Sequence, residues 1–199
     1  MPQVRKPSQR RSQQRVSLIL EATAEVLRTR GIAEVTTNSI AEQASIPVSS
    51  IYQYFPNKEA ILVALYSDYL QSIEEVMDEF ETRARLEQPW DAFFTESLKA
   101  IYRQETRDQI DRELQNGLNL FPELMEIENA HRQKFAERLA GMLRKLGSKW
   151  STPRLKRLSL FVYEINTAAW RHRIENKVIS NELLEWETAA ILAVVGRCM

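Results

Sequence analysis

Proline placement is the feature of this sequence that most restricts its fold. Five of the seven prolines, Pro47, Pro56, Pro89, Pro122 and Pro153, separate long segments whose apolar residues recur every three or four positions. This period is that of an α-helix, and proline is tolerated in the first turn of a helix but not in its interior. We therefore predict an all-α fold of about nine helices, at residues 12–30, 37–44, 48–55, 58–86, 90–105, 108–118, 121–146, 152–176 and 181–197.

The composition excludes several other classes of protein. With 44% hydrophobic and 27% charged residues, the 199-residue chain can build a globular core, as one sizeable domain or as a small module on a larger one. No apolar run approaches the roughly 18 to 20 residues that span a bilayer, and no apolar stretch with a cleavage site follows the basic N-terminus. The single cysteine, Cys198, rules out an internal disulfide framework. We expect a cytoplasmic protein with no membrane partner.

The charges are divided unevenly along the chain, although they sum to zero. Residues 1–58 contain eight Lys or Arg and four Glu, which gives +4, and the remainder therefore carries −4. Residues 1–11 have no apolar periodicity and are basic, so we predict a disordered basic arm there. A basic head on an acidic body suits a head that meets phosphates, although basic tails also occur simply as solubilising segments.

Residues 41–55 contain a helix, a tight turn and a second helix. One set of side chains is apolar and would hold the two helices together: Ile40, Ala44, Ile46, Ile51 and Phe55. The face opposite is polar or aromatic and contains no acidic residue, which suits the second helix of a helix-turn-helix in the major groove. The alternative is a helical hairpin buried in a protein core, but the outward face is too polar for that.

This stretch, IAEQASIPVSSIYQYFPNKEAIL, closely resembles the signature of the TetR/AcrR-type family of bacterial transcription regulators. The matching elements are Ile40-Ala41-Glu42-Gln43-Ala44, Ile51-Tyr52-Gln53-Tyr54-Phe55 and Lys58-Glu59, preceded by Thr36-Thr37. The resemblance is strong over residues 14–65 and extends further only as an architecture. It implies three parts: the arm 1–11, a helix-turn-helix domain 12–58, and a ligand-binding and dimerisation domain 59–199.

The resemblance implies DNA-binding roles for eight residues: Thr37, Val48, Ser49, Ser50, Tyr52, Gln53, Tyr54 and Lys58. Thr37, Tyr54 and Lys58 would hold phosphates, and Tyr52 would pack against the sugar-phosphate backbone. The other four would lie in the groove, with Val48 on a thymine methyl group. The sequence departs from the family pattern where Ser45 and Ser49 replace common glycines and Val48 replaces a common Lys or Arg. More discrimination would then fall to Gln53, the arm and DNA shape.

The body would pair with a second copy through its last two helices. The apolar residues of both helices spread over more than one side, so each helix must pack against other helices on two sides. The interface would include Phe161, Ile165, Trp186, Ala190, Ala193 and Val194. The family resemblance implies that the last two helices of two chains form a four-helix bundle. Deep burial within a monomer is the alternative.

The resemblance also implies a ligand pocket in the body. Aromatic residues on the appropriate helices are candidates to line it: Trp90, Phe94, Tyr102, Phe121, Tyr163 and Trp170. Pockets are mostly apolar with a few polar groups, but aromatic residues at helical spacing are also typical of ordinary core. The sequence therefore leaves open whether these six side chains touch a ligand.

Nothing in the sequence indicates an enzyme, a cofactor or a metal site. His131 and His172 lack partners at metal-ligand spacing, and no phosphate loop or catalytic motif occurs. We expect a ligand-responsive homodimeric regulator, a repressor released from a palindromic operator by a small apolar effector. A regulator controlled by a protein partner, and an enzyme or carrier that shares the fold, are the alternatives.

Overall fold

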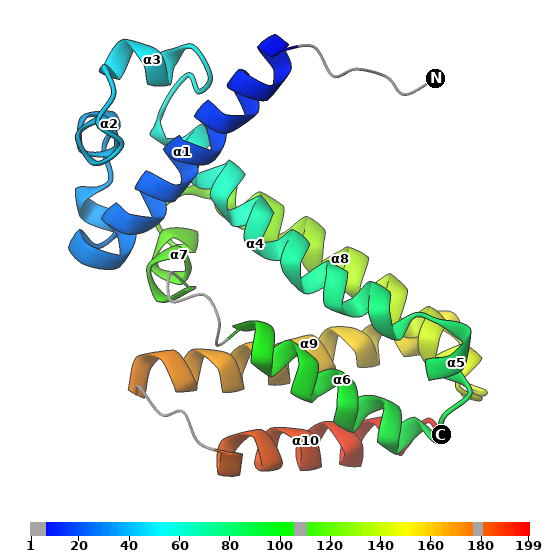
Figure 1. The fold of residues 1–199 in the computed structure, drawn as a ribbon. Coiled ribbons are helices and arrows are strands. Elements are labelled where there is room, and N and C mark those ends of the chain that lie inside the picture. The colour runs from blue at the N-terminus through cyan, green and yellow to red at the C-terminus, as the bar shows by residue number, and fades with distance from the viewer. Residues whose placement is uncertain (1–6, 106–110, 177–180) are drawn as a thin grey trace, which may run out of the picture. The chain divides into compact units, whose positions relative to one another are not determined.

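The computed structural model describes residues 7–105, 111–176 and 181–199, which form helices and no strand. The helices are α1 (Pro7–Arg30), the 3-10 turn η1 (Ile32–Glu34), α2 (Thr37–Gln43), α3 (Val48–Tyr52), α4 (Lys58–Phe80), α5 (Arg83–Leu86), α6 (Trp90–Glu105), α7 (Asp111–Leu118), α8 (Pro122–Lys145), α9 (Thr152–Asn176) and α10 (Asn181–Val195) (Figure 1). The predicted all-α fold is confirmed. None of these helices is long and apolar enough to cross a membrane.

Several predicted boundaries differ from the structure, most clearly the start of the first helix and the end of the long helix predicted at residues 58–86. The first helix begins at Pro7, so residues 7–11 of the predicted arm are helical, and residues 1–6 lie outside the described residues. Apolar periodicity could not reveal this turn, because Arg10 and Arg11 favour helix without marking an apolar face. The predicted helix 58–86 is divided into α4 and α5, because the chain turns after Phe80, whose ring packs edge-on against Phe93 at 5.9 Å.

The described chain divides into two compact units. The first contains α1 to α3, the start of α4 up to Asp68, and Glu113–Met125, which includes most of α7. The second contains Tyr69–Arg112 and Glu126–Met199. The first unit, called the head below, therefore extends beyond residue 58 and includes residues 59–68 and 113–125.

Local signals explain the shape of the first unit. The apolar face of α1 buries Ile19, Val26 and Leu27, and the helix stops at Gly31, whose φ of 82° is costly for residues with a Cβ. Thr36 then caps α2 through a reciprocal pair of hydrogen bonds. Its Oγ1 accepts from the Ser39 N–H at 3.0 Å, and Ser39 Oγ accepts from the Thr36 N–H at 2.9 Å.

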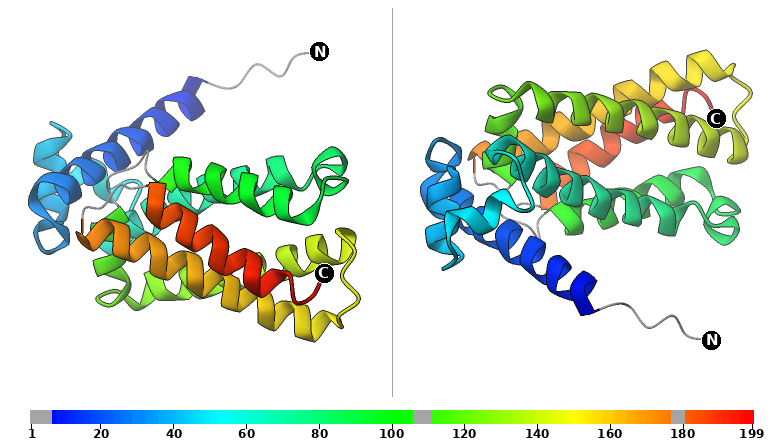
Figure 2. Two further views of the ribbon diagram at one scale, coloured as in Figure 1. Left: turned by 90° about the horizontal axis from the view of Figure 1, so that it is seen from below. Right: turned by 90° about the horizontal axis from the view of Figure 1, so that it is seen from above.

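The second unit has a core of aliphatic and aromatic side chains from α4, α6, α8, α9 and α10. α9 packs along α10, and α10 also contacts α6 (Figure 2). A buried ion pair joins α9 to α10, because Arg173 Nη1 lies 2.6 Å from Glu187 Oε2. The Arg173 guanidinium also lies 5.0 Å from the centre of the Tyr102 ring of α6.

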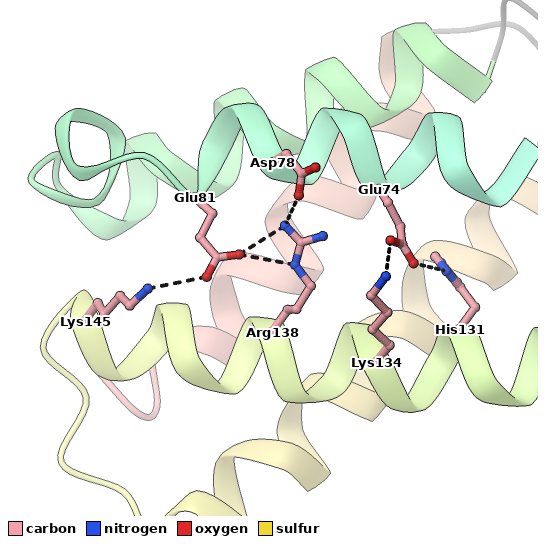
Figure 3. A network of polar contacts seen from close by, with 7 residues as sticks. All are labelled: Glu74, Asp78, Glu81, His131, Lys134, Arg138 and Lys145. Atoms are coloured by element: carbon pink, nitrogen blue, oxygen red, sulfur yellow. Dashed lines mark hydrogen bonds and ion pairs between the residues drawn. The ribbon is translucent and has the colours of Figure 1, made fainter. Parts of the chain in front are cut away.

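A row of ion pairs joins α4 to α8 within this unit (Figure 3). Arg138 bonds to Asp78 at 2.6 Å and to Glu81 at 3.0 Å, Lys145 approaches Glu81 at 3.4 Å, and Lys134 bonds to Glu74. The partners advance together along both sequences, so α4 and α8 run parallel here.

Candidate nucleic-acid interface

The helix-turn-helix is held by a turn at Ser45. Its backbone has a φ of 53°, and the Ile46 N–H donates back to the Ala41 carbonyl at 3.0 Å. Ile40, Ala44, Ile51 and Phe55 are buried as the sequence predicts, and Ile46 is half-buried. These side chains fix α3 against α2, so the polar side of α3 is presented outward.

The outward side of α3 carries most of the predicted DNA-binding residues. Ser49, Tyr52 and Gln53 are exposed, whereas Val48, Ser50 and Tyr54 are half-buried. The helix ends at Tyr52, three residues before the predicted end, and the chain continues as turns in which Tyr54 and Phe55 donate to the Ile51 carbonyl at 2.9 Å. Gln53 therefore projects from the end of the recognition helix.

The structure brings two of the predicted DNA-binding residues together. The Thr37 and Tyr52 hydroxyls lie 3.2 Å apart, which joins the start of α2 to the end of α3. The Tyr52 ring remains 54% exposed. An aromatic ring held by its hydroxyl and open on its face is suited to lie along a sugar-phosphate backbone.

Lys58 stands at the start of α4. Asn57 caps this helix, its Oδ1 accepting from the Ala60 N–H at 2.9 Å. The Lys58 ammonium is 5.4 Å from the centre of the Phe121 ring, within the distance of a cation–π interaction. The Phe121 ring therefore lies beside the Lys58 ammonium at the start of α4.

The charges near this surface favour an anionic partner. No acidic residue occurs between Pro47 and Lys58. Two carboxylates of the head are neutralised by arginine, Glu25 by Arg28 at 2.5 Å and Glu42 by Arg30 at 3.3 Å. The outward side of α3 therefore does not repel phosphate.

The second unit contains a small apolar cavity between α4, α6, α8 and α9. Its volume open to a water-sized sphere is about 40 Å³, and only Ser97 and Asn166 among its lining residues are polar. The apolar lining consists of Val76, Met77, Phe80, Phe93, Phe94, Leu98, Ile101, Phe135, Leu139, Met142 and Val162. This lining suits an apolar guest and carries no charge.

Of the six aromatic residues predicted to line a pocket, only Phe94 lines this cavity. Tyr102 lines an open groove between α6 and α10, and Trp90 packs beside Gly196. Tyr163 donates to Glu128 at 2.8 Å, and Trp170 stacks on Tyr69. Phe121 belongs to the other unit, against Lys58. Aromatic type and helix position did not distinguish these environments, because each depends on which helix is the neighbour.

The residues predicted to form a dimer interface lie on α9 and α10. Phe161 and Trp186 are large apolar side chains that remain 54% and 60% exposed. Ala190 and Ala193 are exposed, and Ile165 and Val194 are half-buried. Together they leave an apolar face that the described chain does not cover.

A polar cluster on α4 and α8 includes the buried His131. Burial lowers the pKa of His131, although Glu128 and Glu74 oppose this shift. Burial alone would raise the pKa of Glu74, but Lys134 and His131 outweigh that effect and lower it. His131 Nδ1 lies 3.4 Å from Glu74 Oε1 without the alignment of a hydrogen bond, so we regard the histidine as neutral. Among the described residues, no group of His, Cys, Asp or Glu is placed to hold a metal ion.

Sequence reasoning missed Glu113, whose carboxylate accepts a hydrogen bond from the Ile32 N–H at 2.9 Å. The two residues are 81 positions apart, and Glu113 lies on a short helix with no motif. It also missed most of the cavity lining, which consists of ordinary apolar core residues. No local signal could have identified either.

Comparison with known proteins agrees with this geometry. Residues 19–65 match the family described as "Bacterial regulatory proteins, tetR family". The "Fatty acid metabolism regulator protein" of Bacillus subtilis (strain 168) is 36% identical over 61 residues, which span 31% of this chain and 31% of that relative.

Two solved structures share the fold over nearly the whole chain. A TetR-family transcriptional regulator from Streptomyces coelicolor has 21% identity and a TM-score of 0.63, and the alignment covers 93% of this chain and 99% of that one. The regulator FadR from Bacillus subtilis, solved in complex with stearoyl-CoA, has 18% identity and a TM-score of 0.70, with 90% and 97% covered.

The family match falls on the part of the chain in which the helix-turn-helix was found. The family consists of transcription regulators and not of enzymes, which removes the enzyme alternative. Residues 19–65 therefore match the TetR family of bacterial regulatory proteins, and the described chain shares its fold with TetR-family structures.

Proposed function

We propose that this chain is a ligand-responsive repressor that binds a palindromic operator as a homodimer. The observation that carries the DNA-binding part is the outward side of α3, where Ser49, Tyr52 and Gln53 are exposed in a segment, residues 47–58, that contains no acidic residue. Gln53 and Ser49 reach base edges, while Thr37, Tyr54 and Lys58 hold phosphates. Tyr52 lies along the sugar-phosphate backbone.

The apolar face on α9 and α10 supports the homodimer. Phe161 and Trp186 expose large apolar surfaces, and the small exposed residues Ala190 and Ala193 of α10 allow another helix to approach closely. A second copy that covers this face pairs like with like, because a two-fold interface uses the same surface on both chains. Two heads related in this way read two inverted half-sites.

The cavity supports an apolar effector. Eleven of its thirteen lining residues are apolar, and the fold is shared with a regulator solved in complex with stearoyl-CoA. We propose the acyl chain of an acyl-CoA as the first candidate. A space of about 40 Å³ holds only a few water molecules, so the lining must open to admit such a chain. Met77 and Met142 are flexible enough to do so.

The small size of the cavity also favours a second candidate. Ligand pockets typically enclose about 300–1,000 Å³, and this cavity is far smaller. In this second mechanism a protein partner controls DNA binding, and the cavity is only a packing defect.

The test begins with selection of DNA from a random pool by the purified chain, followed by fluorescence anisotropy on the selected sequence. The proposal expects an inverted repeat with half-sites about 34 Å apart centre to centre, and release on addition of stearoyl-CoA but not of coenzyme A. Leu98→Trp, which fills the cavity, should remove that response, whereas Lys99→Trp on the exposed side of α6 should keep it. Selection of an inverted repeat with no response to stearoyl-CoA would favour control by a partner.

A further inference from the structure

The chain leaves α1 at a point that is fixed from a distant part of the sequence. Glu113 of α7 accepts a hydrogen bond from the Ile32 N–H, the first residue of η1, at 2.9 Å. Gly31 permits this approach, because a Cβ at Gly31 would lie 3.3 Å from Glu113 Oε2 and its φ of 82° disfavours other residues. The Glu113 carboxylate therefore accepts a hydrogen bond from the Ile32 N–H, which lies between α1 and α2 and has no acceptor within a helix.

The same side of α7 packs closely on the head. Leu114, Gly117 and Leu118 are buried, and a Cβ at Gly117 would come within 3.0 Å of Leu124 and 3.5 Å of Ile32. Residues 113–121, here called the α7 corner, are thus part of the DNA-binding unit, although they lie outside the helix-turn-helix.

At the other end of the α7 corner, Phe121 meets Lys58. The ammonium lies 5.4 Å from the ring centre, and a lysine side chain otherwise has many rotamers. Lys58 is one of the proposed phosphate ligands. The ring therefore restricts the lysine to part of its range before DNA binds.

We propose that Glu113 and Phe121 are positioning residues for DNA binding, Glu113 by fixing the backbone between α1 and α2 and Phe121 by directing Lys58. The inference rests on the proposed function, because it requires that the head bind DNA. Neither residue touches DNA in this account. Each acts through a named group, the Ile32 N–H or the Lys58 ammonium.

The test for Glu113 compares two substitutions. Glu113→Gln keeps an acceptor oxygen, and Glu113→Ala leaves the Ile32 N–H without one. We expect the alanine variant to raise the operator Kd about tenfold and to speed hydrogen exchange at the Ile32 amide by a similar factor, while the glutamine variant stays within about twofold of the parent protein. Glu123→Ala, an exposed carboxylate of the same unit, is the control. An alanine variant with unchanged Kd and unchanged exchange would overturn this half of the inference.

The test for Phe121 is a double-mutant cycle with Lys58. Phe121→Leu should raise the operator Kd about threefold, whereas Phe121→Tyr, which keeps an aromatic ring, should leave the Kd near that of the parent protein. In the Lys58→Ala variant, Phe121→Leu should have no further effect on the Kd. Leu120→Ala, at an exposed neighbour in the same corner, is the control. If Phe121→Leu raises the operator Kd by the same factor in the parent protein and in the Lys58→Ala variant, the ring contributes only to packing.

Failure of the inference can be separated from failure of the proposed function. A parent protein that selects no DNA sequence overturns the proposed function and this inference together. A parent protein that binds its operator, with every variant binding equally well, overturns this inference alone.

Discussion

Ser45 has a left-handed backbone, with a φ of 53°, at the turn between α2 and α3. This conformation costs a residue with a Cβ about 1–2 kcal/mol, and TetR-family sequences often have glycine here. The serine is exposed, so no packing offsets this cost. The turn therefore retains strain that a glycine would relieve.

Ser45→Gly should raise the free energy of unfolding by about 0.5 kcal/mol, since the relief of strain exceeds the added entropy of the unfolded chain. Urea unfolding followed by circular dichroism measures this. Ser17→Gly, at an exposed position inside α1, should instead lower it by about 0.5 kcal/mol, because glycine has the lower helix propensity. A loss of stability at both positions would contradict the strain argument.

His131 should make the protein sensitive to mild acid. Burial lowers its pKa in the folded state below the ordinary value of about 6.5, so below that pH the unfolded chain binds a proton that the folded chain does not. The free energy of unfolding therefore falls as pH decreases from about 6.5 towards the folded pKa. Urea midpoints at pH 7.5 and 5.5 should show this fall, and His131→Gln should reduce it.

His172→Gln is the matched control for this measurement, because His172 is exposed and is the other histidine of the chain. It should leave the difference between the two pH values unchanged. If His131→Gln also leaves it unchanged, the neutral buried state that we assign to His131 is wrong.

At the scale of elements, we expect α3 and the start of α4 to have different roles in DNA binding. Gln53 projects from the end of α3 and is exposed, whereas Lys58 is half-buried at the first turn of α4 beside Phe121. A side chain at a base edge reads sequence, and a lysine on a phosphate does not. Substitution of Gln53 should therefore change the preference for particular base pairs, whereas substitution of Lys58 should change the affinity for all DNA sequences.

Lys58→Ala should weaken binding to operator and random DNA alike and reduce the dependence of log K on log salt by roughly one. Gln53→Ala should cost about 1–3 kcal/mol at one base pair in each half-site and spare random DNA. Anisotropy titrations at several salt concentrations measure both, with Gln43→Ala on the exposed side of α2 as control. Identical effects of the two substitutions would refute the division.

At the scale of the whole molecule, we expect the uncovered apolar face on α9 and α10 to pair two copies of the chain. Ala190 and Ala193 are exposed in the single chain. A charged side chain at either position would therefore destabilise the proposed dimer interface but would not disturb the core of the single chain. Ala190→Glu and Ala193→Glu should each cost the dimer several kcal/mol.

Analytical ultracentrifugation should therefore find these variants monomeric, with unchanged helical circular dichroism and weakened operator binding. Glu182→Ala, at an exposed polar position of the same helix, should remain dimeric. Variants that stay dimeric would place the interface elsewhere.

The sequence by itself determined the helices and the DNA-binding motif. Their signals are local: prolines at helix starts, Thr36 as a cap, Gly31 as a stop, and apolar residues three or four apart. Such signals act within a few residues, and the predicted helix 90–105 coincides with α6 for that reason.

Only the tertiary structure determined which residues from distant parts of the sequence contact one another. Phe121 and Phe94 look alike in sequence, but one lies against Lys58 in the head and the other lines the cavity. Glu113 bonds to the Ile32 N–H across 81 positions. Most of α7 belongs to the first unit, although α5 and α6, which precede it, belong to the second. These outcomes depend on which helices pack together, and packing is set by contacts between segments far apart in sequence, which no local pattern records.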